Sequence, residues 1–167
     1  HWWQQNKRVG SSLIAKRTYD VDLIMSVAAM PEFFSTVEDG MTLDRYKPDM
    51  NSAWILVSDG NEVIGLAQLV PLNSIVLELH PQVFKKHRAK YNKTFFYELY
   101  KWILVNATQY QKVNATMPVI YKHLKRFALS VGFTLEGVDR QSHIKNGDIV
   151  DRWIFGITKK ELKKVIA

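Results

Sequence analysis

A dense group of basic side chains follows the dipeptide His80-Pro81. Lys and Arg occupy five of the nine positions from 85 to 93, and the stretch from 82 to 93 contains no glycine. A lysine ammonium binds phosphate as a point charge, so the group could hold a phosphorylated ligand. It could equally be the solvated face of a long helix, or a surface that grips nucleic acid. The five residues are Lys85, Lys86, Arg88, Lys90 and Lys93.

Two titratable side chains precede this group in an apolar run. Glu78 alternates with Leu77 and Leu79, so in a strand its side chain points to one face of the sheet. If that face lines a cleft, the carboxylate could act as a general base or position a water molecule. Otherwise Glu78 is a solvent-facing strand residue. Histidine can titrate near neutral pH, but we expect His80 to cap the helix that follows.

The composition excludes several other kinds of site. The chain of 167 residues has no cysteine, which excludes disulfides, thiolate nucleophiles and cysteine metal ligands. Its five histidines lack ligand spacing, and the sequence has no Ser-His-Asp signature and no glycine-rich nucleotide loop. No apolar run approaches the roughly 20 residues of a membrane helix. The net charge of +7 predicts an anionic partner.

Apolar periodicity predicts strands and helices along the chain. The order is a strand, two helices, three antiparallel strands, a helix, a strand, a helix and two final strands. Such a pattern requires one twisted sheet with helices on both faces. The predicted strands are 13–17, 53–58, 63–70, 74–80, 113–117, 133–137 and 149–157, and the predicted helices are 21–28, 31–37, 91–106 and 118–131.

Capping and turn residues set the boundaries of these elements. Asp20 can cap the first helix, and Pro31 suits the first turn of the second. Gly132 stands where a helix C-terminus favours a left-handed residue. Asn146-Gly147 is a strong hairpin signal, and Asp59-Gly60-Asn61 is a second one.

The segment from Met117 to Ile157 combines these signals in a characteristic order. A helix ends at Gly132-Phe133, a strand follows, and after the Asn146-Gly147 turn comes a strand that contains Trp153-Ile154-Phe155-Gly156-Ile157. This segment closely resembles the C-terminal third of the GNAT superfamily, the acyl-coenzyme A-dependent N-acyltransferases, especially its ribosomal-protein acetyltransferase-like branch. The order of the elements extends the resemblance over residues 13–159.

The resemblance implies an α/β (α+β) GNAT fold, with a mixed, mostly antiparallel twisted sheet of about seven strands and helices on both faces. Strand 74–80 would separate from strand 113–117 and pair with the pantetheine arm of coenzyme A. The backbone from Leu77 to Leu79 would then contact the acyl carbonyl, and Glu78 would be the base.

The phosphate site departs from the family pattern. GNAT proteins place Gln/Arg-x-x-Gly-x-Gly/Ala after this strand, so that backbone amides at a helix N-terminus hold the pyrophosphate. Glycine is absent here, and glycine is what lets a backbone approach phosphate oxygens closely. The resemblance implies that side chains would bind coenzyme A instead, namely Lys85, Lys86, Arg88, Lys90, Asn92 and Lys93.

The family's usual proton source is also missing. Many GNAT enzymes carry a tyrosine four residues before the glycine of the Gly-Phe pair, where it protonates the leaving thiolate. That position is Ala128 here. Tyr121 and Ser130, on the same predicted helix, are the candidate replacements, although Tyr121 could instead belong to the apolar core.

The resemblance therefore implies an N-acyltransferase that transfers an acetyl or other acyl group from acetyl-coenzyme A to a primary amine, without a metal. The acceptor would be a protein N-terminus, a lysine or a small molecule. The alternative is a non-catalytic GNAT-like binding or structural protein, such as a phage virion component or a nucleic-acid-binding module. We expect one domain over 1–167, with 1–11 a tag remnant or a flexible N-terminus, and a cytoplasmic location, or the virion under the alternative.

Overall fold

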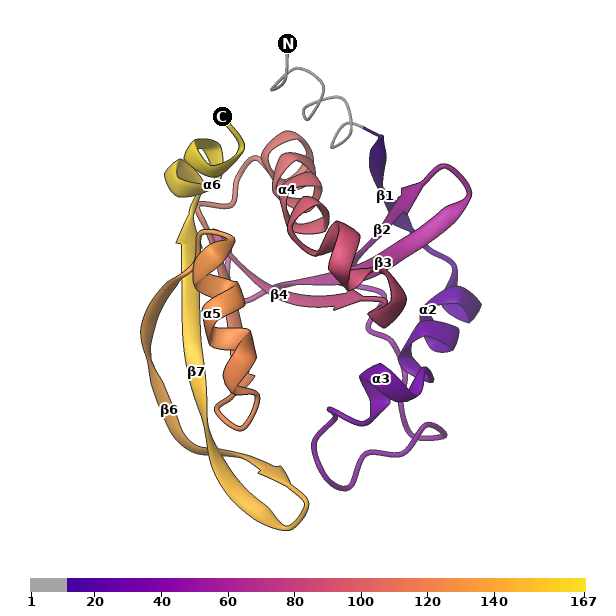
Figure 1. The fold of residues 1–167 in the computed structure, drawn as a ribbon, viewed down its shortest axis with the longest axis vertical. Coiled ribbons are helices and arrows are strands. Elements are labelled where there is room, and N and C mark those ends of the chain that lie inside the picture. Colours follow the sequence, from indigo (N-terminus) through magenta and orange to yellow (C-terminus); the bar gives the residue numbers. More distant parts are fainter. Residues whose placement is uncertain (1–11) are drawn as a thin grey trace.

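The computed structural model describes residues 12–167, so the expectation for residues 1–11 lies outside it. Seven strands and six helical segments follow one another in the predicted order, with two additions (Figure 1). They are β1 Leu13–Thr18, α2 Val21–Ala28, α3 Pro31–Phe34, β2 Ala53–Asp59, β3 Glu62–Pro71, β4 Val76–Val83, the 3-10 turn η1 Lys85–His87, α4 Arg88–Asn106, β5 Lys112–Pro118, α5 Lys122–Ser130, β6 Thr134–Lys145, β7 Asp148–Thr158 and α6 Lys159–Ile166.

One sheet contains all seven strands, in the order β1-β2-β3-β4-β5-β7-β6. Every neighbouring pair is antiparallel except β4 and β5, which are parallel and joined through α4. The predicted fold class, a mixed and mostly antiparallel sheet with helices, is confirmed.

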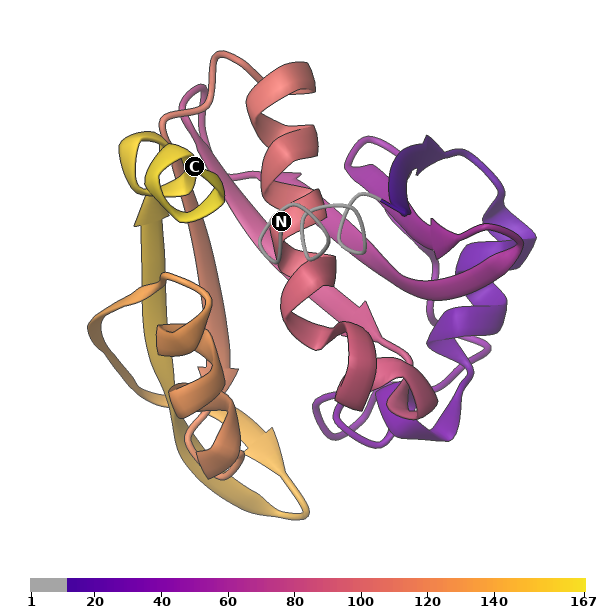
Figure 2. The ribbon, with the colours of Figure 1, turned by 45° about the horizontal axis from the view of Figure 1, so that its top comes forward.

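Helices cover both faces of the sheet (Figure 2). On one face the larger core packs against α4, α5 and α6, with Phe95, Leu99 and Tyr100 of α4 and Leu162 of α6 almost completely buried. On the opposite face α2 and α3 pack through a smaller core that includes Trp54 of β2. Strand side chains alternate between these two cores, as Ile55 and Val57 in the larger core and Trp54 in the smaller core show for β2.

The local signals in the sequence are confirmed at atomic detail. Asp20 caps α2 by accepting a hydrogen bond from Leu23 N at 3.1 Å. Gly132 follows α5 with φ +100°, and Asn146 and Gly147 both have positive φ at the β6–β7 turn. Two positive φ angles in a two-residue hairpin loop match the right-handed twist of the flanking strands.

Two boundaries in the C-terminal part were predicted wrongly, and one helix was missed. The helix expected from 118 begins only at Lys122, because Pro118 still belongs to β5 and pairs with Arg152. The strand expected over 133–137 continues to Lys145 as β6, with register shifts that the alternation of side chains did not reveal. The terminal helix α6 was missed, although Thr158 and Glu161 form its capping box.

The strand expected over 74–80 was also misplaced, since β4 spans Val76–Val83 and passes through Pro81. Ile75 O accepts from Gln111 N on the β5 side, and Phe84 N donates to Ile64 O of β3, so odd-numbered β4 residues turn their backbone groups away from β3. The missing N–H of Pro81 therefore faces away from the β3 ladder, where proline breaks no hydrogen bond.

Candidate functional site

The sheet opens between β4 and β5, as predicted. The two strands pair at only three positions, Val76 with Lys112, Leu77 with Val113 and Glu78 with Asn114. Beyond that point β4 continues to Val83 and β5 to Pro118 without pairing to each other. We call the last paired position, Glu78 with Asn114, the apex of the opening.

The edge of β4 that faces the opening carries unpaired backbone groups. By the alternation along the strand, the Leu79 C=O is the first carbonyl past the apex that points toward β5, and no β5 residue beyond Asn114 pairs with β4. Farther along, the guanidinium Nε of Arg88 donates to the Val83 carbonyl at 3.0 Å. A strand edge of this kind accepts an extended ligand by main-chain hydrogen bonds.

Two polar side chains lie next to each other at the apex. Glu78 and Asn114 are register partners, and both point to the α2/α3 face, because their neighbours Leu77 and Val113 belong to the core under α4. The Glu78 side chain is 24% exposed, and His80 Nε2 lies 2.7 Å from its Oε1. His80 is thus a β4 residue that contacts Glu78, and the prediction that it caps the next helix is wrong.

Asn114 was not identified from the sequence. Its Oδ1 is buried and has no hydrogen-bond donor among the described residues 12–167. A buried acceptor without a donor costs about 1–3 kcal/mol, so the position has an unfilled requirement for an N–H or O–H group. The only signal in the sequence is an amide between the apolar residues Val113 and Ala115.

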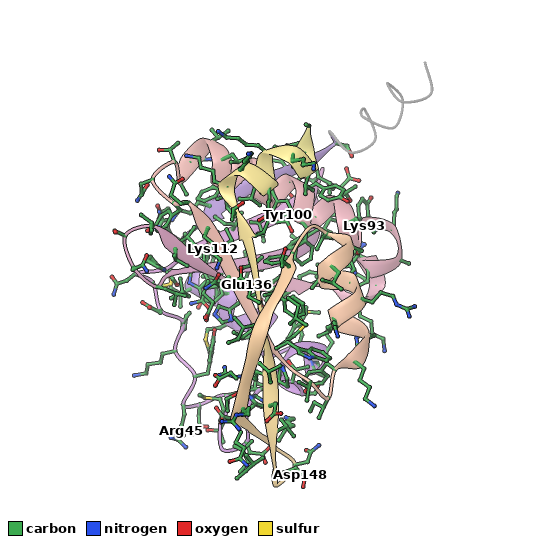
Figure 3. All side chains as sticks on the ribbon, turned by 90° about the vertical axis from the view of Figure 1, so that its left-hand side faces the viewer. Arg45, Lys93, Tyr100, Lys112, Glu136 and Asp148 are labelled. Atoms are coloured by element: carbon green, nitrogen blue, oxygen red, sulfur yellow. The ribbon has the colours of Figure 1, made fainter. Side chains whose placement is uncertain are left out.

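The basic group after β4 lies in a short 3-10 turn and at the start of α4. Gln82 and Val83 end β4, Lys85–His87 form η1, and α4 begins at Arg88. Lys90 and Lys93 therefore lie on the first two turns of a helix, and Lys93 projects from α4 above α5 (Figure 3). This position is compatible with both hypotheses, a solvated helix face and a phosphate site.

Carboxylates of the protein itself already occupy part of this region. The backbone N–H of Lys85 donates to Oε2 of Glu32 from α3, and Arg88 Nη2 lies 3.9 Å from the same oxygen. Glu62 of β3 contacts Lys86 at 3.2 Å and His87 at 2.8 Å. The hydrogen bonds from His87 and Lys86 hold the pKa of the Glu62 carboxyl below its usual value.

The side chains of the remaining candidate phosphate ligands are not paired with carboxylates of the described residues. Lys85, Lys90 and Lys93 make no ion pair within residues 12–167, and all three are exposed. Lys90 Nζ lies 5.0 Å from the centroid of the Tyr91 ring. Asn92 is partly buried in the first turns of α4. Three cations of the predicted five are therefore free to meet an anion.

The two candidate proton donors lie at opposite ends of α5. Tyr121 is the N-cap residue, at the end nearest the C-terminus of β5, and burial raises the pKa of its phenol. Ser130 is the last helical residue, exposed, with its hydroxyl donating to Phe127 O at 2.7 Å. A nine-residue helix is about 13 Å long, so the two cannot serve one atom. Ala128 is buried in the larger core.

The segment 35–52 between α3 and β2 crosses to the tip of the β6–β7 hairpin. Asp39 accepts hydrogen bonds from Asn146 N at 3.0 Å and Gly147 N at 2.8 Å, and Lys145 Nζ donates to Val37 O at 2.6 Å. These backbone N–H groups lower the pKa of Asp39. Figure 3 shows Arg45 and Asp148, from the segment and the hairpin, at the same end of the molecule. The opening is thus bounded on the α2/α3 face.

Two structural features limit other kinds of site in residues 12–167. No three His, Asp or Glu side chains converge as a metal-ligand set. Over the same residues, no helix combines the length and apolar character needed to cross a membrane.

The comparisons with known proteins agree with this architecture. The spermidine N-acetyltransferase of Vibrio cholerae, in a complex with CoA and spermine, superimposes with a TM-score of 0.76 at 17% sequence identity, covering 92% of this chain and 99% of that chain. The spermidine/spermine N-acetyltransferase SpeG of Vibrio cholerae, in a complex with manganese ions, gives a TM-score of 0.73 at 17% identity, covering 93% and 97%. No curated protein matches the sequence. At such identities the likeness establishes the GNAT fold.

The family model described as "Protein of unknown function (DUF2824)" matches residues 15–167. That match covers nearly the whole described chain, from β1 to α6. The protein therefore belongs to the DUF2824 family, and it has the fold of the GNAT N-acetyltransferases.

Proposed function

We propose that the protein is an N-acyltransferase that uses acetyl-coenzyme A and a primary amine, with its site at the apex of the β4–β5 opening. The observation that carries the proposal is the juxtaposition of Glu78 and Asn114 where the two strands separate. One is a carboxylate and the other a buried oxygen without a donor, so together they form an acceptor pair for an N–H group. An amine supplies such a group.

Each side of the opening has a part in the reaction. The acyl thioester would lie along the free edge of β4, with the Leu79 backbone next to its carbonyl. The amine nitrogen forms a bond to the carbonyl carbon while the carbon–sulfur bond breaks. Glu78 accepts the proton that the amine loses, and His80 holds the carboxylate in place. The thiolate gains a proton from Tyr121, Ser130 or water.

The cations after β4 suit the phosphates of coenzyme A only in part. Lys90 and Lys93, on the first turns of α4, can neutralise phosphate charge without displacing anything. The Lys85 amide is already bonded to Glu32, and Lys86 is paired with Glu62. Binding at these two positions requires the carboxylates to move aside, so we expect modest affinity that falls as salt increases.

The solved V. cholerae structures indicate which acceptors to try first, because one of them contains spermine. The test has two stages. Thermal shift and calorimetric titration with acetyl-coenzyme A measure binding, since a ligand specific to the native state raises its melting temperature. Release of free thiol is then followed with spermidine, a lysine peptide and a peptide with a free N-terminus. Absence of binding at millimolar acetyl-coenzyme A would overturn the proposal.

A second candidate function rests on the internal carboxylates. Glu32 and Glu62 satisfy the groups that would otherwise attract a phosphate, in a region that has no glycine to bring the backbone close. A GNAT scaffold that no longer binds coenzyme A, and instead has a binding or structural role, accounts for this arrangement. Melting temperatures that do not respond to coenzyme A, together with no thiol release, would favour it.

A further inference from the structure

The charges of this chain are divided unequally between its parts. The helical layer formed by η1, α4, α5 and α6 contains thirteen Lys and Arg but only Glu98 and Glu161 as acids, a net charge of +11. The whole chain has a net charge of +7, so all remaining residues together carry −4. These helices cover the same face of the sheet (Figure 2). The molecule is therefore strongly positive on one face only.

The cations of this layer form rows along the helices. Lys122, Lys125 and Arg126 on α5 have the spacing i, i+3, i+4. Residues at this spacing share one face of a helix. The same spacing recurs on α6 at 160, 163 and 164, while the opposite side of α6 places Leu162 in the core. A third row, at positions 86, 90 and 93, runs from η1 onto the first turns of α4.

Most members of the rows have no internal counter-charge. No ion pair within residues 12–167 involves the α6 row, and the α5 row also lacks one, although Lys125 Nζ lies 5.7 Å from the centroid of the Trp153 ring. Only Lys86, Arg88 and Lys101 of the whole layer contact carboxylates. Uncompensated like charges raise the energy of the isolated protein, and a polyanion would relieve it.

We propose that the α4/α5/α6 face binds the phosphate backbone of double-stranded DNA. DNA presents one negative charge per about 1.7 Å of helix axis, so it can meet several rows at once. The proposed phosphate ligands of coenzyme A all lie on η1 and α4, and none belongs to the α5 or α6 row. The proposal is thus independent of acyl transfer, although Lys90 and Lys93 could serve both ligands.

DNA suits this face better than an anionic membrane does. An amphipathic helix binds a membrane by burying its apolar side among the lipids. The apolar sides of α5 and α6 are already packed on the sheet, through Phe127 and Ala128 and through Leu162 and Val165. What remains outside is mainly charged, which favours contacts to phosphates without insertion.

The test measures the binding of a fluorescein-labelled 20-base-pair duplex to the full chain by anisotropy, between 50 and 200 mM NaCl. In one variant Lys160, Lys163 and Lys164 are replaced by Gln. A matched control replaces Lys16, Lys47 and Arg140 by Gln, because these three are also exposed but lie outside the helical layer. Both variants lose three positive charges, so net charge alone cannot explain a difference. Melting temperatures verify that both fold.

We expect the α6 variant to bind DNA at least tenfold more weakly at 50 mM NaCl, and the control to stay within twofold of the unmodified protein. The slope of log affinity against log salt should flatten by about 2.7 in the α6 variant, as three phosphate contacts are lost. Equal weakening in both variants would overturn the proposal, and so would binding to phosphatidylserine vesicles without binding to DNA. Coenzyme A titration of the α6 variant should match the unmodified protein, which separates this result from the acyltransferase test.

Discussion

Glu32 and Lys85 are joined by a hydrogen bond from the Lys85 backbone N–H to the Glu32 carboxylate, at the start of the turn that leads into α4. A helix N-terminus is where a protein most readily binds a phosphate. In this chain a side chain of α3 holds that place, and any phosphate arriving there must compete with it.

Replacement of Glu32 should reveal this competition. Glu32→Gln keeps the size of the side chain and removes its charge, and two unit charges about 4 Å apart in water repel by about 1 kcal/mol. Affinity for coenzyme A, measured by calorimetry at low salt, should therefore rise about fivefold. Glu38→Gln, an exposed carboxylate after α3, is the matched control. Equal affinities for the Glu32 variant and the unmodified protein would show that no phosphate approaches Lys85.

Glu78 is the residue on which the proposed chemistry depends. Glu78→Gln removes the proton acceptor without altering shape, so turnover with acetyl-coenzyme A and a reactive amine should fall about 100-fold or more. Affinity for coenzyme A should stay the same, since Glu78 lies on the α2/α3 face. His80→Gln, which retains an N–H near Glu78, should lose much less activity. An unchanged rate in Glu78→Gln would show that Glu78 is a solvent-facing strand residue and not the base.

Replacement of Asn114 should weaken amine binding without lowering the stability of the protein. Asn114→Ala removes a buried oxygen that has no donor, which offsets the small cavity it leaves, so the melting temperature should not fall. The KM for the amine should rise, because one of its two acceptors is lost. Thr116→Ala is the control, because Thr116 is the next residue on the same face of β5. A clear loss of stability in Asn114→Ala would show that its side chain is already satisfied in solution.

Gly65 is required for the close packing of α4 on β3 and β4. A Cβ at this position would lie 2.4 Å from Gln82 O and 2.9 Å from Phe95 Cε2. Gly65→Ala should therefore lower the free energy of unfolding by about 1–3 kcal/mol, measured in urea, because backbone and a core ring must shift. Gly137→Ala in β6, where a Cβ would meet nothing within 4 Å, should change it little. Similar results for both would contradict this packing.

The contact of Asp39 with the hairpin should depend on pH. Its pKa in the folded protein is lowered by the Gly147 and Asn146 backbone N–H groups, so its stabilising effect is complete above the ordinary aspartate pKa of about 4. The effect disappears as the pH falls below 4 through the folded-state value. Asp39→Asn should thus be less stable than the unmodified protein at pH 7, and the difference should shrink below pH 4. Asp44→Asn, which removes an exposed carboxylate outside this contact, is the matched control.

Local signals in the sequence were sufficient for most of the fold. Asp20, Gly132 and Asn146-Gly147 act through their own backbone geometry, which requires no knowledge of distant residues. Pro81 misled because its effect depends on its neighbour: proline ends a strand that is paired on both sides, but not one that has no partner on the side of its missing N–H. The separation of β4 from β5 decides this, and it is a tertiary property.

The candidate site was harder to predict for the same reason. Glu78 could be proposed from its place between two leucines. The ion pairs that Glu32 and Glu62 make with the basic group link residues between about 25 and 55 positions apart, and nothing in either local pattern indicates a partner. Asn114 gains its significance only from lying opposite Glu78 where the pairing stops.

The Asp39 contact has a mechanical consequence for the sheet. The half that contains β1–β4 and the half that contains β5–β7 share three residue pairs at one end of β5, while the hairpin tip lies past the other end. Asp39 and Lys145 connect the halves there, so the two halves and the segment 35–52 form a closed ring (Figure 1). A ring that is fixed at two opposite points cannot widen by rotation at either one alone. In the proposed acyltransferase, entry of a bulky acceptor would require the segment itself to detach, so residues that touch no reacting atom would set the size of the acceptor.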